Sequence, residues 1–223
     1  MPWGNPEDSG PSINPERMNK SCFTVLLALV SSVAFGADEP GFRSKLFKQG
    51  KLVYADEFDE TLVRGRYGPN KKNITVAEGK LQVLPISDGT INTVVHIYRI
   101  PKKFVCHLRY KVNSKDPDAG VGLQIGGHKM HLGKQKGEEG NVSLFSRVGK
   151  KTFILPEVKG FAANEWIDMI IEYEEGRILL NINGSEKIFE DAAVSMDGAS
   201  SLVFKKNSDS LLFDHVRLWE ATE

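Results

Sequence analysis

The chain has 223 residues, of which 40% are hydrophobic, and 29 Lys and Arg balance 29 Asp and Glu. This length and apolar content are enough for one well-formed core. Because the charges give no basic excess, a nucleic-acid partner is not expected.

The first 36 residues have the features of a leader. Residues 1–17 are rich in Pro, Gly, Ser and Asn, so we expect them to be disordered. Met18 is an alternative start, after which Lys20 precedes the apolar run SCFTVLLALVSSVAFG, typical of a secretory signal. This run is shorter than the roughly 20 residues that span a bilayer. We therefore predict export to a secreted or periplasmic location, with cleavage after Gly36 and no membrane association afterwards.

The rest of the chain is predicted to form one all-β domain over residues 45–223, after a mobile lead-in at 37–44. Short runs of alternating polarity are separated by turn residues at roughly the 8–12-residue spacing of sandwiches and barrels, without a helical period. The predicted strands cover 51–56, 73–77, 80–85, 91–98, 103–113, 120–125, 128–133, 141–148, 151–155, 166–174, 177–183, 186–190, 200–205 and 211–220.

One cysteine follows the predicted cleavage site. Cys106 lies in the apolar strand KKFVCHLRYKV, so no disulfide can form within the mature chain. We expect this thiol to be buried and inert.

The clearest hairpin is predicted in NEWIDMIIEYEEGRILLNINGSEKIFED, at 164–191. Apolar residues fall at every second position on both sides of Glu175-Gly176. Asn183-Gly184 ends the second run with a dipeptide that accepts positive φ, which is a strong signal for a tight turn.

Four segments carry a resemblance to a known family. In chain order, VYADEFDETL, ITVAEGKLQVL, NEWIDMIIEYEEGRILLNING and LLFDHVRLWEA resemble the concanavalin A-like jelly-roll domains. Within that group they are similar to the bacterial 3-keto-disaccharide hydrolase family and to laminin-G-like and family 16 glucanase-type folds. The resemblance implies a jelly-roll sandwich of two antiparallel sheets over residues 50–221. It implies architecture and leaves the activity open, because one fold serves many functions.

The acid-rich stretch ADEFDET matches part of the pattern that carries the catalytic residues of a retaining glucanase. That chemistry needs two carboxylates about 5.5 Å apart, which an E-x-D-x-E pattern on one strand provides. Glu57 and Asp59 match its first two positions, but Thr61 stands at the third. Hydrolysis of the family 16 type is therefore not expected, and the resemblance to the jelly rolls implies that DEFD opens the first strand and is structural.

Calcium is the one cofactor for which the sequence offers ligands. Asp56 near the first strand and Asp214 on the last could meet, and related jelly rolls often bind calcium there. The alternative is that Asp214 caps a turn or pairs with a Lys or Arg. No cofactor is otherwise required.

A polar surface is predicted on two strands joined at Gly126-Gly127. The apolar residues of VGLQIGGHKMHL point to one side, and Gln124, Lys129 and His131 lie on the other, with Arg147 nearby. On the concave sheet of a sandwich, such groups suit a hydroxyl-rich ligand. These four residues are the predicted ligand-binding site, with carbohydrate as the partner.

Histidines offer no metal pair, because His128 and His131, three apart on a strand, face opposite sides. His96, His107 and His215 show no companions in the sequence and are expected at the surface or between strands.

The hydrolase family that the chain resembles tends to carry Gly-Tyr-Glu-x-Gln where this chain has HKMHL. The difference favours a changed specificity or a lost reaction.

Three functions remain open at this point. The leading hypothesis is an exported carbohydrate-binding jelly roll. The main alternative is a hydrolase acting on 3-keto-glycosides, for which His131 or an acid of the 134–140 loop is the candidate acid or base. The third is a structural or protein-binding sandwich of the laminin-G-like kind. The sequence assigns neither a catalytic residue nor an oligomeric state.

Overall fold

The computed structural model describes residues 43–59, 74–84, 92–113, 121–127, 129–134, 141–159, 164–196, 201–206 and 210–223. The predicted leader and most of the lead-in lie outside these ranges. Within them, no helical segment has the length and apolar character needed to cross a bilayer.

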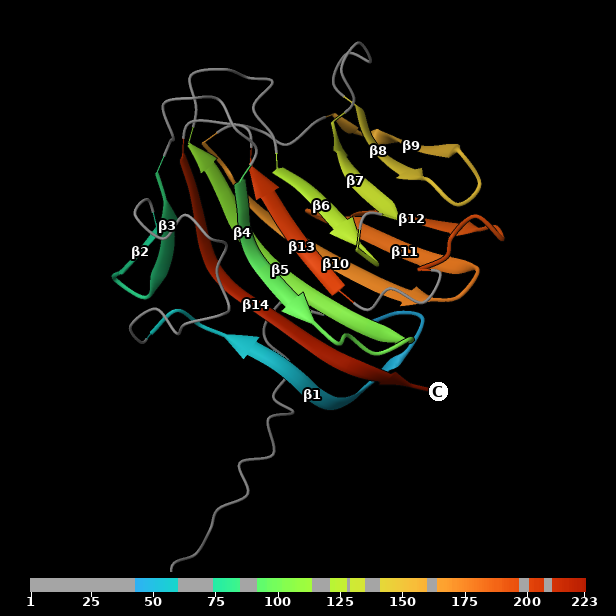
Figure 1. The fold of residues 1–223 in the computed structure, drawn as a ribbon, viewed down its shortest axis with the longest axis horizontal. Helices are drawn as coiled ribbons and strands as arrows, with labels where there is room; N and C mark the ends of the chain where they lie inside the picture. Colours follow the sequence, from blue (N-terminus) through green and yellow to red (C-terminus); the bar gives the residue numbers. More distant parts are fainter. Residues whose placement is uncertain are drawn as a thin grey trace, which may run out of the picture. The chain divides into compact units, whose positions relative to one another are not determined.

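The described residues form an all-β fold with antiparallel pairing, as predicted (Figure 1). The strands occur at the predicted places and differ from the prediction mainly in length. Their bounds are β1 (Lys48–Asp56), β2 (Ile74–Ala77), β3 (Lys80–Val83), β4 (Asn92–Tyr98), β5 (Phe104–Asn113), β6 (Val121–Ile125), β7 (Met130–Lys134), β8 (Asn141–Ser146), β9 (Lys151–Lys159), β10 (Trp166–Glu174), β11 (Arg177–Ile182), β12 (Ser185–Glu190), β13 (Ser201–Lys206) and β14 (Ser210–Thr222).

One sheet has eight strands, in the order β12-β11-β10-β5-β14-β3-β2, with β1 also paired to β14. The long strand β14 pairs with β5 along one edge. Its other edge is shared, because Leu211–Phe213 pair with β3 and Val216–Thr222 pair with β1. Figure 1 shows β14 in red between β5 and the blue β1.

The second sheet has six strands, in the order β4-β13-β6-β7-β8-β9. Apolar side chains of both sheets form one buried cluster, to which the eight-stranded sheet contributes Leu108 and Tyr173 and the six-stranded sheet Leu123 and Met130. The two sheets therefore pack on a common core, as in a β-sandwich.

The predicted hairpin is confirmed. Gly176, with a φ of 82°, turns the chain between β10 and β11, and Asn183-Gly184 follows with φ values of 51° and 86°. The Asn183 Oδ1 atom accepts the Asp168 N–H at 2.8 Å. A backbone that needs positive φ at both turn residues explains the Asn-Gly pair.

Residues 44–47, here called the N-terminal strap, lie against the eight-stranded sheet on the side away from the shared core. The fully buried carboxylate of Glu172 accepts the Ser44 hydroxyl at 2.9 Å and the backbone N–H groups of Lys45, Leu46 and Phe47 at 2.7, 2.8 and 3.1 Å. Phe47 packs on Val105 and Ile170 in a second small cluster. Ser44, which the sequence places in the lead-in, is thus bound to the sheet.

Cys106 is free and fully buried in the core. Burial raises the pKa of its thiol well above the usual value. The prediction of a buried thiol is confirmed.

Candidate functional site

The two strands of the predicted ligand surface pair as expected. Leu123, Ile125, Met130 and Leu132 are buried in the core. Gln124 and His131 are cross-strand partners on the opposite, outer face of the six-stranded sheet. Gln124 Nε2 lies 3.1 Å from His131 Nδ1, so the two side chains form one hydrogen-bonded unit.

Gln124 differs from the prediction in its exposure. It was expected on a solvated surface, but it is only 6% exposed, while His131 is partly exposed. Its Oε1 atom is buried and has no hydrogen-bond partner in the described structure. Turning the amide over would give His131 the oxygen and leave the amide nitrogen without a partner instead. In either orientation, one polar group of this buried amide is unsatisfied.

The other two predicted residues lie one step along the same ladder. Arg147 N donates to Lys129 O at 2.8 Å, which continues the pairing of Met130 with Ser146 by one residue. Lys129 is partly buried and Arg147 is exposed. The structure therefore brings Gln124, Lys129, His131 and Arg147 together at the end of the sheet where β6 turns into β7. His128 lies outside the described residues.

Aromatic and small residues complete this face. The row that contains Gln124 and His131 continues to Phe145 and Thr152 on β8 and β9. On β4, His96 stacks on Tyr98, with ring centroids 3.7 Å apart, and Tyr98 is 63% exposed. The outer-face side chains that the structure describes within the strands are His96, Tyr98, Gln124, His131, Ser143, Phe145, Thr152 and Ile154, and they include no carboxylate.

In the acid-rich stretch, the first Glu has a structural role. Glu57 accepts two hydrogen bonds from Arg217 on β14, from Nε at 2.5 Å and from Nη2 at 2.7 Å. Such a two-point pairing fixes the segment after β1 to the neighbouring strand. Asp59 is exposed, and Thr61 lies outside the described residues.

The two predicted calcium ligands serve other partners in the structure. Asp56 Oδ1 accepts the Phe58 N–H at 3.1 Å, which holds a turn. The carboxylate of Asp214 lies 3.8 Å from Lys80 Nζ and 3.8 Å from Arg109 Nη1, which matches the ion-pair alternative. Within the described ranges no group of three or more His, Cys, Asp or Glu side chains is arranged to hold a metal ion. Calcium stays a prediction.

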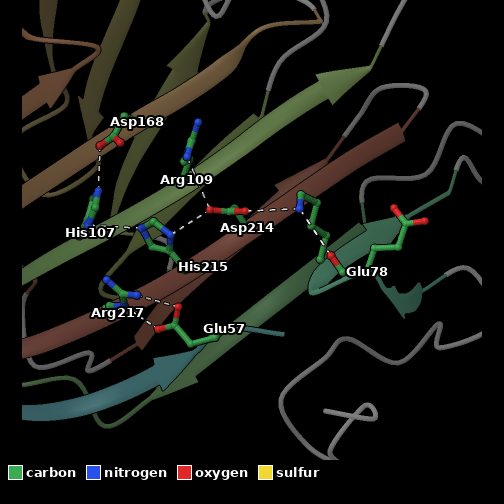
Figure 2. Close-up of polar contacts among 9 residues, drawn as sticks. Glu57, Glu78, His107, Arg109, Asp168, Asp214, His215 and Arg217 are labelled. Atoms are coloured by element: carbon green, nitrogen blue, oxygen red, sulfur yellow. Dashed lines mark hydrogen bonds and ion pairs between the residues drawn. The ribbon is translucent and has the colours of Figure 1, made fainter. Parts of the chain in front are cut away.

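A polar chain that the sequence analysis missed crosses the outer side of the eight-stranded sheet (Figure 2). His107 Nε2 lies 2.8 Å from Asp168 Oδ1, and His107 Nδ1 lies 3.3 Å from His215 Nε2. His215 Nδ1 then lies 3.3 Å from Asp214 Oδ2. The expectation that His107 and His215 have no companions is wrong, because the pairing of β5 with β14 places them side by side.

Proton counting constrains this chain. Three contacts in series need three hydrogens, and two neutral imidazoles supply two. All three contacts are therefore hydrogen bonds at the same time only when the histidine pair carries one extra proton. Burial, followed by the charges of His107 and Arg217, lowers the pKa of His215 and opposes that proton. Burial alone would raise the pKa of Asp168, but the hydrogen bond from His107 and nearby positive charges outweigh it and lower the pKa.

A β-bulge explains why His215 was missed. The register between β14 and β5 shifts between Phe213 and His215, so Phe213 is in the core while His215 lies on the outer side. In LLFDHVRLWEA the apolar positions jump from Leu211 and Phe213 to Val216 and Leu218. This break in the two-residue period is the sequence signal from which the bulge could have been predicted.

The comparisons with known proteins report on the fold. No protein-family model matches the sequence, and no curated protein matches it. The resemblance to the 3-keto-disaccharide hydrolases is therefore not confirmed.

Solved structures with the same architecture include carbohydrate-active enzymes. A structure of endo-acting O-glycanases that prominent members of the human gut microbiota express to initiate mucin breakdown matches 77% of this chain and 100% of its own, with 10% identity and a TM-score of 0.57. The laminarinase from Rhodothermus marinus matches 80% and 100%, with 12% identity and a TM-score of 0.54. LamA from Z. galactanivorans, solved with laminaritriose and laminaritetraose, matches 78% and 100%, with 10% identity and a TM-score of 0.52. At these identities the likeness shows the fold alone, a concanavalin A-like jelly roll.

Proposed function

We propose that this protein binds carbohydrate on the outer face of its six-stranded sheet. The observation that carries the proposal is the buried Gln124 amide with one unsatisfied polar group. Such a group costs about 1–3 kcal/mol when left without a partner. Because this atom is covered in the described structure, a hydroxyl-rich ligand would reach it only after a local rearrangement of the face, and would then supply the missing hydrogen bond.

The surroundings of the amide suit a sugar. His131 offers a second polar group beside Gln124, and Phe145 continues the same row with an apolar ring. Tyr98, stacked on His96, adds an exposed aromatic surface on the same face. A few convergent polar groups on an apolar platform are typical of small-molecule and saccharide sites. The jelly-roll fold, which laminarinases share, is consistent with this use.

Hydrolysis of a 3-keto-glycoside is the second candidate. It would need a general acid or base, and His131 is the candidate that the described outer face offers. Because the described side chains of this face include no carboxylate, we favour binding without turnover. Product formation from 3-keto sugars by the parent protein, lost in His131→Ala, would establish hydrolysis instead.

The proposal is tested by removing the amide while keeping its volume. Gln124→Met should weaken binding of neutral glycans on a glycan array by about tenfold or more, because the buried hydrogen-bonding group is lost. Its effect on thermal stability should be small, since the removal of an unsatisfied buried group offsets the loss of the hydrogen bond to His131. Met is preferred to Ala here, because truncating a buried residue would leave a void.

Gln82→Met on β3 of the other sheet is the matched control and should bind as the parent does. Unchanged glycan binding by Gln124→Met, or an equal loss in Gln82→Met, would overturn the assignment of this face.

Export is also proposed, on the sequence of residues 1–36 alone. Expression in a host with a secretion pathway should yield an exported protein that starts at Ala37. N-terminal sequencing checks this, and a cell-retained protein that keeps Met1 or Met18 would contradict it.

A further inference from the structure

The dipeptide Asn183-Gly184 carries a chemical reactivity besides its role in the turn. It is the one Asn-Gly in the sequence, and both residues are exposed between β11 and β12. In such a dipeptide the Gly backbone nitrogen can attack the side-chain Cγ of the preceding Asn, because glycine has no Cβ to hinder the approach. A Cβ added at Gly184 would have no neighbour within 4 Å in the described structure, so water also reaches this turn.

The reaction is a spontaneous deamidation. A bond forms between Gly184 N and Asn183 Cγ, the bond between Cγ and Nδ2 breaks, and the side-chain nitrogen leaves as ammonia with the proton of the attacking N–H. The product is a cyclic succinimide. Water then opens the ring at either carbonyl and leaves Asp or isoaspartate at 183. Water is the co-reactant, and nothing is oxidised or reduced.

The native turn holds the two reacting atoms apart. Asn183 has a φ of 51°, in the left-handed region, where ψ is about 47°. At this ψ, the nitrogen of Gly184 lies on the opposite side of the Asn183 Cα–C bond from the side chain. Ring closure needs the nitrogen and Cγ on the same side. The turn must therefore leave its native conformation before the reaction begins.

Hydrogen bonds fix both reacting groups in this conformation. The Asn183 Oδ1 atom accepts the Asp168 N–H at 2.8 Å, and the Asn183 N–H donates to Asp168 O at 2.9 Å. This pair extends the β10–β11 ladder beyond Met169 and Ile182 by one step. The Gly184 N–H donates to Asn181 Oδ1 at 3.0 Å. The attacking nitrogen must give up this bond before it can turn towards Cγ.

We propose that Asn183 is a deamidation site that the folded turn protects and that local opening of the hairpin makes reactive. Segments at the end of a hairpin open at a smaller free-energy cost than the whole fold. Isoaspartate carries the main chain through the side-chain carbon, which lengthens the backbone, so the tight turn cannot re-form. Isoaspartate at 183 is then a permanent record of an opening that reacted. This inference does not depend on carbohydrate binding.

The test incubates the whole protein at mildly alkaline pH, with and without guanidinium chloride. Peptide mapping by mass spectrometry measures Asp and isoaspartate at 183 over time. Asn181→Ala removes the acceptor of the Gly184 N–H, and Asn181→Asp is the matched control that keeps an oxygen there. Asn183→Gln identifies the signal, because its longer side chain closes a larger ring more slowly.

We expect the folded parent to deamidate at 183 at least about tenfold more slowly than the unfolded chain, since only the open fraction reacts. Folded Asn181→Ala should react about threefold or more faster than the folded parent, because a hydrogen bond that holds the nitrogen is lost. Folded Asn181→Asp should stay as slow as the parent. In guanidinium chloride Asn181→Ala should match the parent, since the protection is a property of the fold.

Three results would overturn the proposal. Equal rates in the folded and unfolded parent would show that the turn gives no protection. A folded parent that reacts faster than the unfolded chain would show that the Asp168 N–H activates the amide instead. Fast modification that persists in unfolded Asn183→Gln would place the reactive residue elsewhere in the chain.

Discussion

At the scale of single residues, His215 links stability to pH. Its pKa in the folded protein is lowered from 6.5, mainly by burial. The unfolded chain therefore binds more protons than the folded one as the pH falls below about 6.5. The stability that depends on neutral His215 is complete above that pH and declines towards the lowered pKa. Asp168, whose pKa is also lowered from 3.8, adds a second loss below about pH 3.8.

We predict that the free energy of unfolding in urea falls between about pH 7 and about pH 5, by at most about 1.4 kcal/mol per pH unit for one proton. His215→Asn should flatten this dependence whatever it does to the absolute stability. Gln82→Met on β3, which removes no titratable group, serves as the control and should keep the slope. A parent slope of zero, or one that survives His215→Asn, would contradict the role given to His215.

Gln124 shows what the alternation of residues along a strand can predict and what it cannot. Alternation in VGLQI correctly predicts that Gln124 lies opposite the core, because side chains on a strand change sides at each residue. It says nothing about what lies above that side, so the burial of Gln124 could not be foreseen. The same limit applies to Asp214, whose Lys and Arg partners come from β3 and β5.

At the scale of elements, the N-terminal strap depends on one carboxylate. Glu172 is fully buried and accepts hydrogen bonds from three backbone N–H groups and the Ser44 hydroxyl. Hydrogen bonds to a charged group contribute about 1.5–3 kcal/mol each. Glu172→Gln should therefore lower the free energy of unfolding by about 2 kcal/mol or more, measured in urea. It should also expose the strap to proteases.

Glu186→Gln is the matched control for this prediction. Glu186 pairs with Lys45 of the same strap, but at the surface, where an ion pair contributes less than about 1 kcal/mol. Similar effects of the two substitutions would mean that the burial of Glu172 is not what fixes the strap.

Strands were the most predictable elements, because their signals are local. Alternating polarity and residues such as Gly176 and Asn183-Gly184 mark both the runs and the turns. The ends of a strand were harder to predict where they depend on pairing with another strand. β1 begins at Lys48 because it pairs with Thr222, and β9 continues through Pro156 to Lys159 at the edge of its sheet, where a proline is tolerated. To predict the bulge in β14, and with it the histidine pair, one would need the register between strands that are distant in the sequence.

At the scale of the whole described domain, both sheets share one core. We predict that they unfold together, so a cavity in one sheet should destabilise the other. Leu132→Ala in β7 removes a fully packed side chain and should cost about 2–5 kcal/mol. Trp166 and Trp219, both on the eight-stranded sheet, report that loss by fluorescence even though the substitution lies in the six-stranded sheet.

Far-UV circular dichroism should follow the same denaturation curve as tryptophan fluorescence in the parent and in Leu132→Ala. Two separate transitions, with the fluorescence midpoint unmoved by Leu132→Ala, would contradict a common core.

The place of β14 in the eight-stranded sheet also determines when, during synthesis, this sheet can fold. Its partners β1, β3 and β5 span residues 48–113, yet β14 itself is residues 210–222. On the ribosome, those earlier strands must therefore wait, with hydrogen-bonding edges open, until about a hundred more residues have been translated. Contacts between such distant segments are slow to form. Nascent chains of this protein should accordingly depend on chaperones that shield open strands until β14 emerges.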